Sequence, residues 1–176
     1  APTAAEDHCA LIDSPSFDSS RRDGYAVRSG EVAGATPDHP VRLRLVGSIA
    51  AGGANNIGVI PGTTVRVLTG ACIPDGADAV VSEEFATKES HEVLIENLAA
   101  PKNILPRGSD VSLGQCLLSK GSSITPVMAG LLAVAGHSRI PVYRSPAIGI
   151  VGTGDEIIEP GEPLHEGKIY ASNIIT

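Results

Sequence analysis

Alternation of apolar and polar residues predicts a set of β-strands in the first half of the chain. Residues 41–49 (VRLRLVGSI) and 63–70 (TTVRVLTG) alternate with a period of two, the pattern of a strand with one buried face. Turns that contain Gly or Pro separate these segments from their neighbours. The predicted strands are 23–30, 41–49, 63–70, 77–85 and 91–98. Short strands at this spacing are typical of a barrel or a curled sheet.

The pattern changes in the segment that follows. Residues 114–124 surround a short apolar run with two glycines and predict a hairpin. Residues 126–135 are apolar at the spacing of a helix. Thr125 is the expected cap, and Pro126 suits the first helical position, where its missing N–H is harmless. Residues 140–144 form a further expected strand.

A continuously apolar run, 147–151 (AIGIV), leads into Gly152-Thr153-Gly154-Asp155-Glu156. Such a run before a Gly turn predicts the opening strand of a parallel α/β sheet. A dinucleotide-binding loop would need glycine at position 157, where Ile157 stands, so this interpretation is disfavoured. Asp155 and Glu156 would lie where α/β sheets bind ligands, and could hold Mg²⁺. Acidic residues are also favoured at an ordinary helix N-terminus.

Composition restricts the partners and the compartment. The 176-residue chain has a formal net charge of −7, 3% aromatic residues and no Trp. We therefore expect an aliphatic core and no nucleic-acid partner, because an acidic surface repels phosphate backbones. No apolar run is long enough to predict a membrane partner. Cys9, Cys72 and Cys116 lack zinc-ligand spacing, and we expect them to be reduced and mostly buried in a cytoplasmic protein.

Two earlier loops also carry candidate chemistry. A turn with positive φ at Gly24 could hold the Asp23 carboxylate outward as a metal ligand or general base, although Asp-Gly pairs are common in ordinary turns. Thr69-Gly70 offers a hydroxyl and a backbone N–H together, which suits an oxyanion. A plain strand-to-turn corner has the same sequence. Glu83-Glu84 could hold a cation or simply be a solvated strand end.

Four ordered motifs together resemble one known family. They are PSFDSSRRDGYA (15–26), PGTTVRVLTGACIPDGADAVVSEE (61–84), NILPRGSD (103–110), and VGTGDEI (151–157) with YASN shortly after it. In this order they are similar to the molybdopterin molybdenumtransferases, the MoeA and gephyrin E-domain family. The likeness spans essentially the whole chain, and four motifs in sequence make a chance match improbable.

This resemblance implies a function and a site. The implied reaction inserts molybdenum from molybdate into adenylated molybdopterin with Mg²⁺, in a homodimer that binds the pterin as a small-molecule substrate. Asp23, Thr69 and Glu156 match the family's catalytic positions, with Asp23 and Glu156 as metal ligands. The implied cofactor-binding residues are Ser20, Gly70, Thr153, Gly154 and Asp155.

The resemblance also implies a mixed, mainly β fold. A distorted β-barrel-like domain, residues 20–101, would be inserted in a small elongated α+β domain made of residues 1–19 and 102–144. Residues 145–176 would be the incomplete start of the molybdopterin-binding α/β domain. The rest of that domain, with its Gly-rich pterin-binding loop, does not occur in this sequence, so this fragment by itself is expected to be inactive.

The sequence departs from the family pattern around the first motif. Ser19 replaces Asn, Arg21-Arg22 replace a small residue and Met, Cys72 replaces Pro, and Ser109 replaces Glu. Two arginines would favour the ionised form of Asp23. They could attract molybdate or instead form an ion pair within the site. These departures keep open an alternative function, a non-catalytic scaffold or dimerisation module derived from this family.

Overall fold

The structure is a computed structural model that describes residues 1–54, 56–97 and 103–172, and it divides into two units, residues 1–142 and 143–176. The elements of the first unit are β1 (His8–Cys9), β2 (Ser19–Ser20), β3 (Gly24–Val27), α1 (Ser29–Val32), β4 (Val41–Ile49), β5 (Thr63–Val67), β6 (Ala79–Ser82), the 3-10 helix η1 (Glu83–Phe85), β7 (Ala86–Glu89), β8 (Glu92–Ile95), β9 (Ile104–Leu105), β10 (Cys116–Leu118) and α2 (Pro126–Val134). The second unit contains β11 (Ile157–Ile158) and β12 (Ile169–Tyr170).

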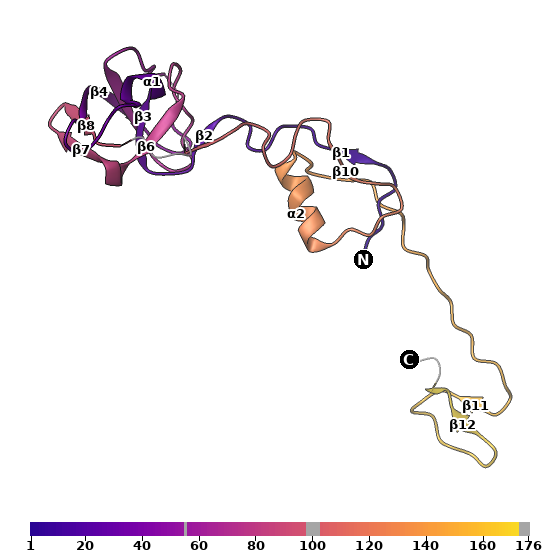
Figure 1. Cartoon of the computed structure of the whole chain (residues 1–176). Helices are drawn as coiled ribbons and strands as arrows, with labels where there is room; N and C mark the ends of the chain where they lie inside the picture. The colour runs from indigo at the N-terminus through magenta and orange to yellow at the C-terminus, as the bar shows by residue number, and fades with distance from the viewer. Residues whose placement is uncertain (55, 98–102, 173–176) are drawn as a thin grey trace. The chain divides into compact units, whose positions relative to one another are not determined.

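Six strands of the first unit form one curled sheet in the order β6-β3-β5-β4-β8-β7 (Figure 1). Neighbouring strands are antiparallel except β4 and β5, which run parallel. The register between β4 and β5 shifts between Leu45 and Gly47, and such a bulge bends a strand and increases its twist. The mainly β fold that the alternating pattern predicts is confirmed.

Strands β3, β5 and β6 of this sheet are buried on both faces. Tyr25 and Val27 of β3 belong to one hydrophobic cluster, whereas Ala26 between them belongs to a second. Successive side chains of a strand point to opposite faces, so each cluster covers one side of β3. Tyr25 is the single aromatic residue among the buried hydrophobic side chains of the described residues. The expectation of an aliphatic core is therefore confirmed.

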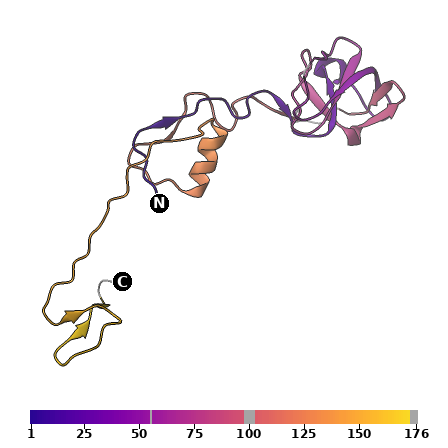
Figure 2. The same ribbon diagram turned by 180° about the vertical axis from the view of Figure 1, so that it is seen from behind.

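The N-terminal segment pairs with the part of the chain that follows the sheet. β1 pairs with β10 and β2 with β9, both antiparallel. α2 lies beside the β1–β10 pair (Figure 2), and its buried Leu132 packs with Ala4, Leu118 and Ile124. Such contacts are required if residues 20–101 are inserted between two halves of another domain. The domain boundaries themselves stay a prediction, and residues 101 and 102 lie outside the described residues.

The helix begins where the sequence predicts. The Thr125 hydroxyl accepts a hydrogen bond from the Met128 N–H at 3.2 Å, and Pro126 is the first helical residue. Gly136, with φ of 98°, follows the end of the helix. This hydroxyl satisfies one of the N–H groups that lack a partner within the helix.

Several predicted elements are wrong in detail. The predicted hairpin 114–124 does not form, because β10 pairs with β1 instead and buries Leu118 against the N-terminal segment. The predicted strand 140–144 is reduced to an isolated bridge at Val142. The strand predicted over 77–85 ends at Ser82, and the one over 23–30 ends at Val27, before α1.

The predicted opening strand 147–151 is absent from the described second unit, which has only the short parallel pair β11–β12. Ile148 and Val151 are each 81% exposed. A parallel strand is stable when both of its faces are covered, and residues 143–172 supply no such cover. The expectation that the cysteines are mostly buried is also wrong: Cys9 and Cys116 are exposed and Cys72 is half-buried.

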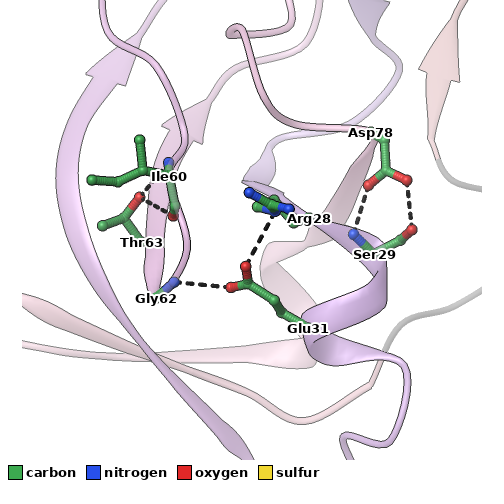
Figure 3. A network of polar contacts seen from close by, with 7 residues as sticks. All are labelled: Arg28, Ser29, Glu31, Ile60, Gly62, Thr63 and Asp78. Atoms are coloured by element: carbon green, nitrogen blue, oxygen red, sulfur yellow. Dashed lines mark hydrogen bonds and ion pairs between the residues drawn. The ribbon is translucent and has the colours of Figure 1, made fainter.

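A polar network fixes α1 to the sheet (Figure 3). The Asp78 carboxylate accepts hydrogen bonds from both the N–H and the hydroxyl of Ser29, each at 2.6 Å. Glu31 pairs with Arg28 at 3.2 Å and accepts from the Gly62 N–H at 2.9 Å. The adjacent cavity of about 390 Å³ is lined in part by these same residues. Because their polar groups bind one another, we assign this network a structural role.

No helix in the described ranges is both long enough and apolar enough to cross a membrane.

Gly24 has no room for a side chain, and this generates a prediction. A Cβ at this position would lie 2.0 Å from the Val81 carbonyl oxygen of the neighbouring strand. Gly24→Ala should therefore lower the free energy of unfolding by roughly 1–3 kcal/mol, the usual cost of forcing atoms into a packed region. Urea unfolding of the chain measures this difference.

Gly30→Ala is the matched control, because a Cβ there would meet nothing within 4 Å. It should leave the stability unchanged or raise it by roughly 0.4–1 kcal/mol. Equal stability of the wild type and Gly24→Ala would contradict the strand packing described here.

Candidate functional site

Asp23 and Thr69 meet at one edge of the curled sheet. Asp23 directly precedes β3 and Thr69 follows β5, and the antiparallel register pairs Gly24 with Val67. This places the start of one strand beside the end of the other. The Thr69 backbone N–H and hydroxyl both donate to Asp23 Oδ1, each at 2.7 Å. The structure therefore brings together two of the three predicted catalytic residues, which are 46 positions apart in sequence.

Gly24 contributes to this geometry in a different way from the one expected. Its φ is not in the positive range, and it lies within β3 rather than in a turn. Glycine is required there because the Val81 carbonyl approaches the position of its absent Cβ. Neither the predicted positive-φ turn nor an Asp-Gly turn with a self-bonded carboxylate is present, since the Asp23 carboxylate is held by Thr69.

The Asp23 carboxylate is held in its ionised form. Hydrogen bonds from the Thr69 N–H and hydroxyl, followed by the positive charge of Arg66, hold the pKa of Asp23 below its usual value. The expected cause was the Arg21-Arg22 pair, whereas Thr69 and Arg66 lower this pKa. Arg66 also pairs with Glu83, with Nη2 and Oε1 2.6 Å apart.

These residues border a polar cavity of about 500 Å³. It is lined by Arg21, Arg22, Asp23, Thr69, Ser82, Glu83 and Glu84. The η1 turn brings its two glutamates to this edge, and the Glu83 N–H donates to the Asp23 carbonyl at 3.1 Å. The cavity thus combines arginines that can attract an oxyanion with carboxylates that can bind a cation.

Arg66 and Ser82 were not predicted as site residues. In the alternating pattern of residues 63–70, Arg66 simply occupies an expected polar position. Its proximity to Asp23 follows from the pairing of β3 with β5, where Tyr25 lies opposite Arg66. Strand alternation shows which face a residue occupies but not which strand lies beside it.

Two predicted cofactor-binding residues have internal hydrogen-bond partners. Gly70, with φ of 80°, donates its N–H to the Ser20 carbonyl at 2.8 Å. The buried Ser20 donates its hydroxyl to the Arg22 carbonyl at 2.6 Å. These bonds hold the loop that carries Arg21, Arg22 and Asp23. The donors that were expected to cradle an oxyanion at Thr69-Gly70 are therefore engaged within the protein.

The remaining predicted residues belong to the second unit. Gly154 has φ of 147° and accepts from the Ile157 N–H at 3.1 Å, and the exposed Glu156 accepts from the Ile169 N–H through its carbonyl at 2.7 Å. The Asp155 carbonyl accepts from the Lys168 side chain. Thr153 lines a cavity of about 280 Å³ with residues of β11 and β12. Convergence of Glu156 with Asp23 and Thr69 stays a prediction, because the units are described separately.

The described residues contain no ready-made cluster of three or more His, Cys, Asp or Glu side chains that could hold a metal ion. A closed protein cage for a metal is therefore not present in the parts of the chain seen here. Mg²⁺ often binds through only one or two carboxylates and completes its shell with water and substrate phosphates. The ionised Asp23 suits that open mode of binding.

Comparison with known proteins identifies similar chains. Residues 2–136 match the family model described as "MoeA N-terminal region (domain I and II)". The chain is 40% identical over 170 residues to molybdopterin molybdenumtransferase 2 of Mycobacterium tuberculosis (strain CDC 1551 / Oshkosh), covering 96% of this chain and 42% of that protein. It is 40% identical over 174 residues to the molybdopterin molybdenumtransferase of Bacillus subtilis (strain 168), covering 96% and 40%.

The fold is similar to a crystal structure of a molybdopterin biosynthesis MoeA protein from Pyrococcus horikoshii. The TM-score is 0.88 at 36% identity, with 98% of this chain and 44% of that chain covered. The chain therefore spans about two fifths of the length of the curated relatives given above.

The hydrogen bonds to Asp23 generate a second prediction. Thr69→Val removes the hydroxyl donor and keeps the backbone N–H, so the pKa of Asp23 should rise toward its usual value. In the wild type, the pKa of Asp23 is lower in the folded state than in the unfolded state. The ionised carboxylate therefore stabilises the fold above its unfolded-state pKa, and this stabilisation is lost as the pH falls through its folded-state pKa. The variant should lose less stability on acidification. Carboxyl ¹³C NMR titration and acid unfolding measure the two effects.

Thr69→Ser is the matched control, since it keeps a hydroxyl at the same position. It should retain the low pKa of Asp23. An Asp23 pKa that is the same in Thr69→Val and the wild type would show that the hydroxyl does not set the charge of this carboxylate.

Proposed function

This chain belongs to the MoeA family through its N-terminal region, and from that premise we propose that it is part of a molybdopterin molybdenumtransferase. The proposed reaction inserts molybdenum from molybdate into adenylated molybdopterin. The pterin dithiolene sulfurs replace oxygens of molybdate, and adenylate leaves. The reaction requires the longer protein, because the curated relatives are more than twice the length matched here.

The observation that carries this proposal is the fixed, ionised carboxylate of Asp23 in a cavity that also contains two arginines. Both hydrogen bonds from Thr69 go to Oδ1, and within the described part of the chain no hydrogen bond is made to Oδ2. A carboxylate fixed through one oxygen can offer the other to a hard cation without rearranging. Preorganisation of this kind lowers the cost of binding.

Asp23 and Glu156 are the residues that would hold Mg²⁺. When bound, the ion would supply positive charge to the substrate oxygens and to the departing adenylate phosphate. Thr69 positions Asp23, and Arg21 and Arg22 would attract molybdate electrostatically to the same cavity. The Arg66–Glu83 pair balances one of the two glutamates, which limits the negative charge that an incoming oxyanion meets.

We also propose that the protein acts as a cytoplasmic homodimer with a second subunit completing the pterin site. The support for this comes from the family resemblance.

A transfer assay on the intact gene product tests the function. With molybdate, Mg²⁺ and adenylated pterin, Asp23→Asn should reduce the rate of molybdenum insertion by at least about 100-fold, the scale of the loss when one preorganised electrostatic group is removed. The substitution keeps the shape of the side chain and removes its charge. Its folding is checked by the thermal unfolding midpoint.

Asp38→Asn is the matched control, because Asp38 is an exposed aspartate that does not line the cavity of Asp23. It changes the net charge equally and should leave the rate unchanged. If wild type and Asp23→Asn are equally inert under conditions in which a related enzyme transfers molybdenum, the proposed activity is wrong.

A further inference from the structure

Cys9 and Cys116 lie opposite each other on the paired strands β1 and β10. The register pairs Cys9 directly with Cys116 and His8 with Leu118. His8 and Leu118 are buried, whereas both cysteines are exposed. The register shifts between these two pairs, because β10 has one extra residue, Leu117, and this β-bulge lets Cys116 be exposed although Leu118, two positions later, is buried. The paired cysteines are therefore both accessible to solvent.

The local hydrogen-bond pattern brings these thiols close together. The Ala10 N–H donates to the Gln115 carbonyl at 2.8 Å, so the adjacent pair, Cys9 and Cys116, occupies a non-hydrogen-bonded position. Cα atoms at such a position are about 4.5 Å apart, within the range of about 4.4–6.8 Å that a disulfide requires.

We propose that Cys9 and Cys116 form a thiol–disulfide exchange site that takes a low-molecular-weight disulfide as co-reactant and closes an intramolecular disulfide between β1 and β10. One thiolate attacks a sulfur of the small disulfide and releases the first small thiolate. The second protein thiolate then attacks the mixed disulfide and releases the other. The protein loses two electrons, the small disulfide gains them, and the two cysteine protons end on the two released thiols.

Cys72 does not belong to this site. It is half-buried, and its Sγ lies 3.6 Å from the Ile73 carbonyl that it contacts. It follows β5 in the loop beside the curled sheet and is not part of either strand of the β1–β10 pair. The chain therefore carries its own internal control for selective oxidation.

The proposed disulfide would join the N-terminal segment to β10, and several other contacts already hold these two segments together. The Lys120 N–H donates to Asp7 at 2.7 Å, and the Leu11 N–H donates to the Ala135 carbonyl at the end of α2 at 2.9 Å. His137 Nε2 lies 2.8 Å from the Cys9 carbonyl. Oxidation would therefore fix the attachment of both β10 and α2 to the N-terminal segment, without moving them.

The rate of exchange should rise with pH. Partial desolvation, the negative charge of Cys116, the hydrogen bond to it and the charge of Asp7 raise the pKa of the Cys9 thiol. The thiolate is the reactive form. A raised pKa lowers the fraction of thiolate at neutral pH, and this slows the first attack on the small disulfide.

Peptide mapping of the full chain tests the proposal. The protein is incubated with oxidised glutathione, alkylated with iodoacetamide and digested with trypsin without reductant. Cleavage places the three cysteines on separate peptides, residues 1–21, 67–88 and 108–120. We expect peptide 1–21 linked to 108–120, with 67–88 alkylated. Linkage to 67–88, or persistent separate glutathione adducts on Cys9 and Cys116, would overturn the proposal.

Two further measurements separate an internal bond from other products. A mixture of ¹⁵N-labelled and unlabelled protein should give no linked peptides of mixed label, and such peptides would show an intermolecular bond instead. Oxidation should raise the thermal midpoint of the wild type by roughly 5–10 °C, because the bond closes a long loop. An unchanged midpoint would contradict the intramolecular bond.

Cys116→Ser is the matched variant. It should retain a glutathione adduct on Cys9 and show no oxidation-dependent rise of the midpoint. Cys9→Ser is the reciprocal variant and should trap the adduct on Cys116, so that the outcome does not depend on the folding of a single mutant. In the wild type the second thiol removes the glutathione adduct by closing the disulfide. If either variant loses its adduct as fast as the wild type does, the second thiol does not play this role and the proposal is wrong.

Discussion

The antiparallel pairing of β3 with β5 is the constraint on which the candidate site depends. This register places the residue before β3 beside the loop after β5, and the Thr69 N–H and hydroxyl then reach Asp23 Oδ1. β3 also pairs with β6 on its other side, so it cannot shift without breaking two sets of backbone hydrogen bonds. A shift of one residue would reverse the faces of Tyr25 and Ala26, which pack in different clusters. The core of the sheet therefore fixes the position of the carboxylate.

The same pairing determines the charges around Asp23. Arg66 lies opposite Tyr25 in β5, and it pairs with Glu83 in the turn that follows β6. Three adjacent strands thus each contribute one charged group at the same edge of the sheet. An exposed ion pair contributes little to stability. Its importance here lies in the electrostatic environment of Asp23, whose pKa falls first through the bonds from Thr69 and then through the charge of Arg66.

Much of the fold could be predicted from local patterns. Residues 41–49 form β4 over their full predicted length, and Thr125 caps α2 as expected. The failures occur where partners distant in sequence decide the structure. β10 pairs with β1 rather than forming a hairpin, and no pattern within residues 114–124 could show this. The apolar run 147–151 pairs with no strand in the described part of its unit, so its hydrophobic character alone does not produce a strand. Free cysteines are usually buried, but Cys9 alternates with His8 on a two-residue strand and faces outward.

The candidate site shows the same division. Asp23 and Thr69 were recognised through the family motifs, whereas Arg66 has no distinguishing feature in its alternating strand and becomes part of the site only through strand order. The motifs themselves combine two kinds of residue. Gly24 and Asp78 lie in motifs that also contain Asp23 and Thr69, yet one permits close approach of Val81 and the other anchors α1 through Ser29. Each of these structural residues supports one end of β3. Gly24 is its first residue, and Asp78 binds Ser29, which lies two residues after the strand ends. Within these two motifs, Gly24 and Asp78 therefore help to hold β3 in place, and Asp23 stands immediately before the strand that they support.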